Sequence, residues 1–418
     1  MSASWNKPVD RRSVIRIALL APIVAATWGS ARAAARDPVH DLLLQGGRVI
    51  DPSQSLDAVR DVAVANGKIA AIESTIDPAT ARRVVDLRGR IVTPGLIDLH
   101  VHGFRGVSHA GLDLDPYCIN RGVTTAVDAG TAGGDSFDGF RRLVIEPSAT
   151  RVLAFLNIAR IGLISPLGEL VDPRMIDRSV ALKAARAHAD VIVGIKVRCS
   201  YFYSGPNDVE AVKSARAVGE EIGKPVMMHI GRPHTPMEVL LDHLRPGDII
   251  THAFRGAGEG GVIGTDGHVS DYIRRAADRG VLFDVGHGAG SFSMAATEAA
   301  LRENFPPSSI SSDIHISSVL GPVFDLVTTM TKFMLLGLPL AKVIELTTIA
   351  PAKAIGRSET LGSLRPGRMA DISVFELAHG DFPVTDSKND TRIAHSRLVP
   401  VFSLRQGGVY ASPSPLDS

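Results

Sequence analysis

Side chains that can bind metals and transfer protons stand at the ends of several apolar segments of this 418-residue chain. The first such segment ends in Asp98-Leu99-His100-Val101-His102. Because strand side chains alternate between faces, both imidazoles are predicted to point the same way. Later apolar segments end in a lysine, two single histidines and an aspartate: Lys196, His229, His252 and Asp313. Neutral imidazoles and a carboxylate are ligands that Zn²⁺ and similar ions accept, so the pattern predicts a divalent metal site.

Each of these residues also has a purely structural interpretation. A single histidine at a strand end more often makes a hydrogen bond in the core than it binds a metal. A lysine on an apolar strand usually pairs with an acid, and Asp313 after two serines could cap a helix. The metal hypothesis is supported by the joint occurrence of all six candidates at the strand ends of one predicted architecture.

That architecture is an alternation of apolar strands and amphipathic helices. Strands are predicted near residues 96–102, 123–129, 151–158, 191–198, 225–230, 248–253, 281–286 and 308–313, with helical patterns between them. Eight such units in about 250 residues favour an α/β fold of the (β/α)8 TIM-type barrel over an open doubly wound sheet. In such a barrel the active site lies at the carboxyl ends of the strands, where the six candidates are placed.

Shorter strands separated by turn residues flank the predicted barrel. They occupy residues 36–90 and resume over residues 357–418. These two segments are predicted to form one small discontinuous β-sandwich domain, and residues 91–356 are predicted to form the barrel between them.

Residues 1–35 have the features of a signal peptide. Arg11 and Arg12 precede an apolar run from Ile17 to Trp28, and small residues follow it, which is typical of a twin-arginine-like export signal. An ordinary secretory signal or a short membrane anchor is the alternative, but for an anchor the run is shorter than the ~20 residues that span a bilayer. We therefore expect an exported, periplasmic protein that is not stably inserted in a membrane after signal removal.

The overall composition excludes several classes of protein. Lys and Arg number 45 against 44 for Asp and Glu, and without a basic block nucleic acid is not an expected partner. Only two cysteines are present, too few for a disulfide framework or an all-cysteine metal site. A small-molecule substrate is the expected partner, and a homo-oligomer is compatible with the sequence.

Four stretches of the chain resemble the amidohydrolase superfamily of metal-dependent hydrolases. They are residues 91–102 (IVTPGLIDLHVH), 194–198 (GIKVR), 312–315 (SDIH) and 362–371 (GSLRPGRMAD). The resemblance covers essentially the whole mature chain. Within the superfamily, the second and third stretches look most like a dihydroorotase-related branch of amidohydrolases and deacetylases.

The resemblance implies a binuclear metal centre with two divalent ions, zinc being the expected metal. His100 and His102 would hold one ion and His229 and His252 the other. The resemblance also implies that Lys196 is carboxylated by carbon dioxide and bridges the ions, which would remove the cost of a protonated amine on an apolar strand. Asp313 would bind the first ion and act as the catalytic residue that moves a proton to the leaving group.

The same branch hydrolyses acyl bonds. The implied activity is therefore cleavage of an amide or ester bond in an N-acyl amino acid or an O-acyl α-hydroxy acid. A deaminase or a cyclic-amide hydrolase like dihydroorotase is the alternative, and a non-catalytic binding homologue is another. Deaminases commonly use one metal and do not need Lys196, and the complete set of six ligands argues against a binding homologue.

Arg198, His287 and His315 are the candidate substrate-binding residues. Arg198 shares strand parity with Lys196 and could bind a substrate carboxylate, although a structural ion pair is an equal alternative. His287, at the end of the seventh strand, is predicted to donate a hydrogen bond to the substrate or an oxyanion. His315 is expected near the mouth of the barrel, where it would orient Asp313.

Two further segments are predicted near the mouth. Residues 201–203 (YFY) follow the fourth strand and could line an apolar pocket. Arg255 precedes a loop of residues 256–267 with six glycines, which is typical either of a mobile lid or of an ordinary surface loop. The sequence leaves both interpretations open.

Overall fold

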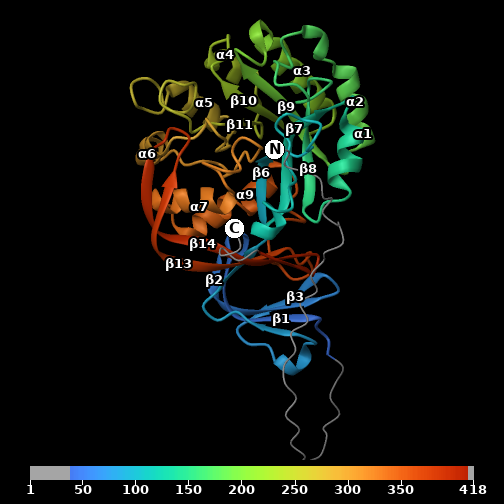
Figure 1. Ribbon diagram of the computed structural model, residues 1–418, viewed down its shortest axis with the longest axis vertical. Helices are drawn as coiled ribbons and strands as arrows, with labels where there is room; N and C mark the ends of the chain where they lie inside the picture. Colours follow the sequence, from blue (N-terminus) through green and yellow to red (C-terminus); the bar gives the residue numbers. More distant parts are fainter. Residues whose placement is uncertain (1–37, 413–418) are drawn as a thin grey trace, which may run out of the picture. The chain divides into compact units, whose positions relative to one another are not determined.

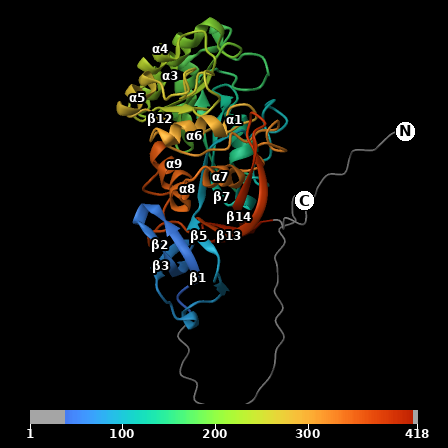
Figure 2. The same ribbon diagram turned by 90° about the vertical axis from the view of Figure 1, so that its left-hand side faces the viewer.

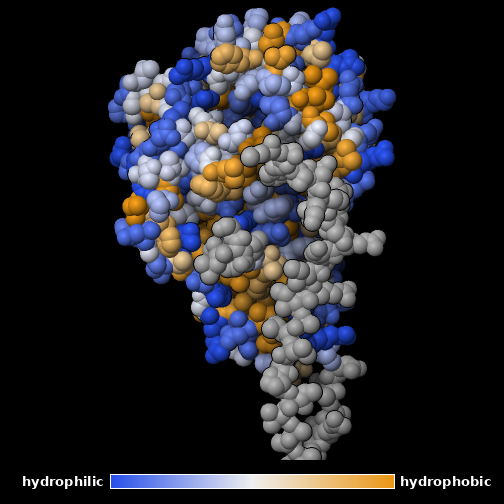
Figure 3. All heavy atoms as spheres, viewed as in Figure 1, coloured by the Kyte–Doolittle hydropathy of each residue, from blue (hydrophilic) through white to orange (hydrophobic). Residues whose placement is uncertain are grey.

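The computed structural model describes residues 38–412, which form a parallel barrel and a mixed β-sheet built from both ends of this range (Figure 1). The predicted signal peptide, residues 1–35, lies outside the described residues. Among residues 38–412, no helix has both the length and the apolar character of a bilayer span. Hydrophilic and hydrophobic residues are interspersed over the face of the molecule in Figure 3.

Seven strands of the barrel pair in parallel and in chain order. They are β6 (Leu96–Val101), β7 (Val123–Gly133), β8 (Arg151–Asn157), β9 (Ile192–Ser200), β10 (Val226–Gly231), β11 (Ile249–Thr251) and β12 (Leu282–Phe283). An irregular segment fills the eighth position: Ser309 bridges Asp284 just after β12, and Ile314 bridges Val101 of β6. The predicted TIM-type barrel is therefore confirmed. Its last strand is irregular because Asp313 has a φ of 48°, a left-handed conformation that cannot continue a strand.

Helices follow the strands, as the alternation predicts. They are α1 (Phe137–Phe140), α2 (Arg178–Ala187), α3 (Asp208–Glu221), α4 (Met237–Asp242), α5 (Asp271–Asp278), α6 (Met294–Arg302), α7 (Leu326–Leu335), α8 (Leu340–Leu346) and α9 (Ile349–Ala354). Capping side chains start several of them, since Asp177, Ser293 and Asp325 each accept a hydrogen bond from a backbone N–H of the first turn. Short helical turns occur at η1 (Pro52–Gln54), η2 (Pro78–Thr80), η3 (Ile119–Arg121), η4 (Arg141–Ile145), η5 (Pro173–Met175) and η6 (Gly205–Asn207).

The two ends of the described range share one eight-stranded mixed sheet. Its strands are β1 (Leu42–Asp51), β2 (Leu56–Ala65), β3 (Lys68–Glu73), β4 (Val84–Asp86), β5 (Ile91–Pro94), β13 (Ile372–Thr385), β14 (Thr391–Arg405) and β15 (Gly408–Ala411). β5 joins the two halves, because it pairs in parallel with β1 and antiparallel with β13. Backbone hydrogen bonds thus connect the predicted sandwich into a single sheet.

The structure also moves the predicted boundary at residue 91. β5 belongs to the terminal sheet, and the barrel begins with β6. Every residue of β5 is buried, as in a barrel strand, and an apolar run does not reveal which sheet it joins.

A long hairpin carries the terminal sheet to the barrel. In Figure 1, β13 and β14 extend from the sheet to the neighbourhood of α6, and Figure 2 shows α7 beside β14. The hairpin turn is anchored there, because Met294 N donates to Asp386 Oδ2 (2.8 Å) and Ser387 N donates to Phe292 O (3.1 Å). Residues from the C-terminal segment therefore reach the loops that follow β12.

An apolar cluster occupies part of the barrel interior. It joins alternate residues of β6 to β11, among them Leu99, Phe155 and Met227, with residues of α9. Met227 Sδ lies 3.5 Å from Lys196 Nζ, so this cluster forms the floor beneath the predicted ligands.

Candidate metal centre and substrate cavity

All six predicted metal ligands line one cavity of about 450 Å³. The cavity lies at the carboxyl ends of the barrel strands, and the ligands come from β6, β9, β10 and the segments after β6, β11 and β12. They are His100, His102, Lys196, His229, His252 and Asp313. The tightest group is formed by His100, His252 and Asp313, with one ligand atom of each within 4.8 Å of the others.

The Asp313 carboxylate lies against both imidazoles of the first barrel strand. Its Oδ1 is 3.2 Å from His100 Nε2 and 3.1 Å from His102 Nε2. Burial opposes ionisation, whereas positive charge on the surrounding imidazoles, His100 first, would lower the pKa of Asp313 well below its ordinary value. A positive charge within this cluster therefore stabilises the ionised carboxylate, the form that a metal ligand or a proton acceptor needs.

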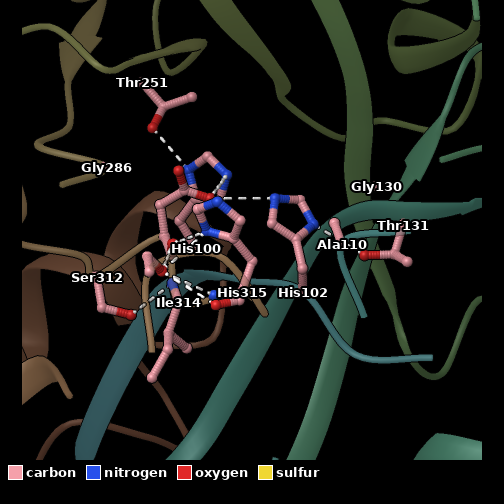
Figure 4. Close-up of polar contacts among 12 residues, drawn as sticks. His100, His102, Ala110, Gly130, Thr131, Thr251, Gly286, Ser312, Ile314 and His315 are labelled. Carbon is pink, nitrogen blue, oxygen red and sulfur yellow. Dashed lines mark hydrogen bonds and ion pairs between the residues drawn. The ribbon is translucent and has the colours of Figure 1, made fainter. Parts of the chain in front are cut away.

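Hydrogen bonds behind two histidines fix which ring nitrogen faces the cavity. Thr251 Oγ1 donates to Asp284 Oδ2 (2.8 Å), so it accepts a hydrogen bond from His100 Nδ1, also at 2.8 Å (Figure 4). His252 Nδ1 donates to Gly286 O at 2.6 Å. Both rings thus carry their proton on Nδ1 and present the Nε2 lone pair, as metal-binding histidines do.

The other two histidines are held by neighbouring side chains. His102 Nδ1 lies 2.8 Å from Thr131 Oγ1 (Figure 4). The His229 ring stands edge-on to His252, with ring centroids 4.3 Å apart, and also contacts the ring of Tyr203. Burial lowers the pKa of His229 well below its usual range, so this imidazole is neutral and able to act as a ligand.

The charges of this cluster fit a bound cation. The Nε2 lone pair of His100 and the Asp313 oxygen face each other at 3.2 Å, which is repulsive unless a positive charge lies between them. Burial lowers the pKa of His100 and takes that of His252 to about 3, so protons are poor candidates for that charge. A divalent metal ion would supply it, and imidazole nitrogens with a carboxylate suit such an ion.

Lys196 is a fully buried amine. Its Nζ contacts His100 Nε2 at 3.3 Å and Met227 Sδ at 3.5 Å, and it makes no ion pair with a carboxylate within residues 38–412. Burial lowers the pKa of Lys196 to about 7. A sizeable fraction of the amine is therefore uncharged at neutral pH.

Arg198 lines the cavity but is committed to an ion pair. Its Nε and Nη2 donate to the two carboxylate oxygens of Glu169, each at 2.6 Å, and the guanidinium lies 3.6 Å from the centre of the Tyr203 ring. The structural ion pair, which was the alternative to substrate binding in the sequence analysis, is therefore present. Within the described range Nη1 makes no hydrogen bond, so it is the part of the guanidinium that can meet a ligand.

His287 does not lie in the cavity, and its predicted hydrogen bond to substrate is wrong. The ring is fully buried against Phe292, its Nδ1 donates to Gly288 O (2.9 Å), and its Nε2 accepts from Lys332 Nζ (2.7 Å). Gly286 and Gly288 both have positive φ and turn the chain, so strand parity no longer holds at His287. The residue anchors the loop after β12 instead.

His315 lines the cavity, as expected. Its Nδ1 is 2.7 Å from the backbone oxygen of Asp313 and 2.9 Å from Ser318 Oγ. The ring therefore contacts the main chain of Asp313, the residue that the sequence analysis expects it to orient.

Sequence reasoning missed the residues that support the ligands. Thr251 ends β11 and Asp284 directly follows β12, so their positions at strand ends were a usable signal. Glu169 and Lys388 lie in a loop and in the hairpin turn, and only the folded chain brings them to the barrel mouth.

The fold and the site define a metal-dependent hydrolase with a TIM-type barrel. The amidohydrolase family model matches residues 91–396, and the chain belongs to this family. A deacetylase of Agrobacterium fabrum is 38% identical over 342 residues, which are 81% of this chain and 83% of the relative.

Two solved structures are similar along most of the chain. One, described as an adenine deaminase, has a TM-score of 0.84 and 32% identity and covers 89% of this chain and 100% of its own. The other, described as a dihydroorotase, has a TM-score of 0.80 and 33% identity and covers 89% of this chain and 97% of its own.

Proposed function

We propose that this protein is a metal-dependent deacetylase that hydrolyses an N-acyl amino acid or an O-acyl α-hydroxy acid. The observation that carries the proposal is the convergence of His100, His252 and Asp313, whose ligand atoms lie within 4.8 Å of one another. Similarity to the deacetylase of Agrobacterium fabrum favours an acyl bond as the target. The likeness to an adenine deaminase makes deamination the second candidate.

Two divalent ions, with zinc as the expected metal, would be held by the six ligands. His100, His102 and Asp313 would hold one ion, and His229 and His252 the other, with carboxylated Lys196 between them. When bound, such ions lower the pKa of water and polarise an acyl carbonyl group.

The surroundings of Lys196 support its carboxylation. An uncharged amine is the form that adds to carbon dioxide, and burial provides that form by lowering the pKa of Lys196 to about 7. The resulting carbamate replaces a buried amine that has no ion-pair partner within residues 38–412 by an anion with two ligand oxygens.

The remaining chemistry belongs to side chains of the cavity. Asp313 is buried at the cavity wall, and in its ionised form it can accept a proton from water and return it to the leaving amine or alcohol. Arg198 lines the cavity, and its Nη1, which makes no hydrogen bond among the described residues, would contact a carboxylate of the substrate while Glu169 keeps the guanidinium in place.

Metal analysis and a substrate panel test the proposal together. The purified protein should contain close to two metal ions per chain. It should release acetate from one enantiomer of N-acetyl amino acids or O-acetyl hydroxy acids. Lys196→Ala should lose metal and nearly all activity, with partial rescue by short carboxylic acids, whereas Lys353→Ala, which alters an exposed side chain of α9, should match the wild type. Ammonia release from aminated heterocycles, without acetate release, would favour the deaminase.

We also propose that the protein is exported and meets its small-molecule substrate outside the cytoplasm. The support is the twin-arginine-like pattern of residues 1–35. Amino-terminal sequencing of the periplasmic protein should begin near Ala34 or Arg36. An intact Met1 on active cytoplasmic protein would contradict export.

A further inference from the structure

We propose that a second cavity beside the metal centre binds an anionic group on the part of the substrate away from the scissile acyl bond. This outer cavity has a volume of about 620 Å³, and its charged lining residues are Arg232, Arg255, Glu259 and Lys388. It adjoins the catalytic cavity, because Tyr203, His229 and Ser291 line both. The inference rests on the proposed function and names a substrate class for it: acyl derivatives of acids with a second acidic group.

Gly231, the last residue of β10, lies beside both a ligand imidazole and Arg255. A Cβ atom at this position would lie 3.2 Å from His229 Nε2 and 3.2 Å from Arg255 Nη1, closer than ordinary van der Waals contact, so a side chain here would crowd both groups. A substrate held at the metal centre would extend past the residues that line both cavities, Tyr203, His229 and Ser291, to reach Arg255.

The outer cavity has an excess of positive charge. Three cationic side chains line it against the single carboxylate of Glu259. Lys388 Nζ donates to Glu259 Oε2 at 2.6 Å, whereas the side chain of Arg232 makes no hydrogen bond or ion pair within residues 38–412. An excess of two positive charges beside a site for small acids attracts an anion and orients it.

Arg255 is held in place and still lacks an acceptor. Its Nη1 donates to Ile230 O at 2.5 Å. Its Nε is buried and lies 3.7 Å from the nearest oxygen of Glu259, so Glu259 is not a close acceptor for the guanidinium. Within residues 38–412 Nη2 makes no hydrogen bond, and a carboxylate oxygen of a substrate would be its acceptor.

The terminal sheet supplies one of the three cations. Lys388 lies in the turn of the β13–β14 hairpin, where Ser387 Oγ donates to Gly288 O (2.8 Å) and Lys388 Nζ contacts Gly290 O (3.2 Å). These bonds tie the turn to the loop after β12, which also lines the catalytic cavity. The position of Lys388 relative to the metal centre is therefore defined by the fold.

A pair of substrates that differ only in charge tests the outer cavity. N-acetylglutamate and N-acetylglutamine have nearly the same size, and the wild type should favour the glutamate compound in kcat/KM by roughly 10-fold, chiefly through KM. This preference should weaken as salt is added. Arg232→Gln should lower the preference several-fold, and Glu259→Gln should raise it, because the substitution removes the only anion of the cavity.

Poor folding of a variant cannot raise the preference for N-acetylglutamate over N-acetylglutamine. The increase expected for Glu259→Gln therefore distinguishes an effect on the outer cavity from misfolding. Arg245→Gln, an exposed arginine paired with Glu220 outside both cavities, is the matched control and should leave the preference unchanged. Equal hydrolysis of both compounds by the wild type, insensitive to Arg232→Gln and Glu259→Gln, would overturn the outer anion site and leave the deacetylase standing.

Calorimetric binding of the same two compounds separates the two hypotheses. Tighter binding of N-acetylglutamate that depends on Arg232, without any acetate release from the acyl panel, would keep the outer anion site and refute the deacetylase.

Discussion

Replacing Thr251 by valine removes one hydroxyl from the support of the metal centre and keeps the shape of the side chain. In the wild type this hydroxyl accepts from His100 Nδ1 and donates to Asp284, both at 2.8 Å. Without it, the His100 proton can move to Nε2, the nitrogen that must bind the metal. Loss of such a supporting hydrogen bond typically costs about 10- to 100-fold in metal affinity or activity.

The Asp284 carboxylate should keep hydrogen bonds to both of its oxygens in Thr251→Val. It also accepts from Ser309 and Ser311, each at 2.6 Å, so it remains hydrogen-bonded at both oxygens. The metal-free variant then loses about 1–3 kcal/mol of stability, the cost of leaving the buried Nδ1 atom of His100 without a hydrogen-bond partner. The main effect therefore falls on metal binding.

Competition with a chromogenic chelator measures the affinity of Thr251→Val for zinc. We expect a dissociation constant about 10- to 100-fold higher than in the wild type, with a smaller change in kcat at saturating metal. Thr93→Val is the matched control, because this buried threonine lies in β5 and its hydroxyl donates to Pro94 O. Wild-type zinc affinity in Thr251→Val would refute the argument that the Asp284–Thr251 pair orients His100.

Three further predictions concern single groups. Asp313→Asn should lower kcat by ~10² to 10⁴ with a modest change in KM and an unchanged circular dichroism spectrum, and a near wild-type kcat would mean that another group moves the proton. Glu169→Gln leaves Arg198 buried without its counter-ion, so urea unfolding should show a loss of about 3–5 kcal/mol, and a stability equal to wild type would contradict the buried pair. Burial raises the pKa of Cys118 and Cys199, so a thiol reagent at neutral pH should modify them only after denaturation; fast labelling of the native protein would contradict their burial.

The candidate metal ligands at the strand ends could be predicted from the sequence because their positions follow from local side-chain alternation. The spacing of His100 and His102 places both on one face of a strand, and in a parallel barrel all strand ends meet at one mouth. Lys196, His229, His252 and Asp313 could be assigned to that mouth without knowledge of any contact. The eight apolar segments determined the barrel for the same reason, since each must be buried on both faces.

Only the tertiary structure decided features that depend on partners far apart in the chain. Arg198 could equally bind a substrate or pair with an acid, and the loop that carries Glu169 settled the choice. His287 lies outside the cavity because two glycines with positive φ turn the backbone after β12. β5 belongs to the terminal sheet because it pairs with β1 on one side and with β13 on the other. Lys388 reaches the outer cavity through a hairpin more than 100 residues after the loop it contacts, as its bond to Glu259 shows. Local pattern determines which face a side chain takes, whereas the partner that satisfies its charge is chosen by the packing of the whole chain.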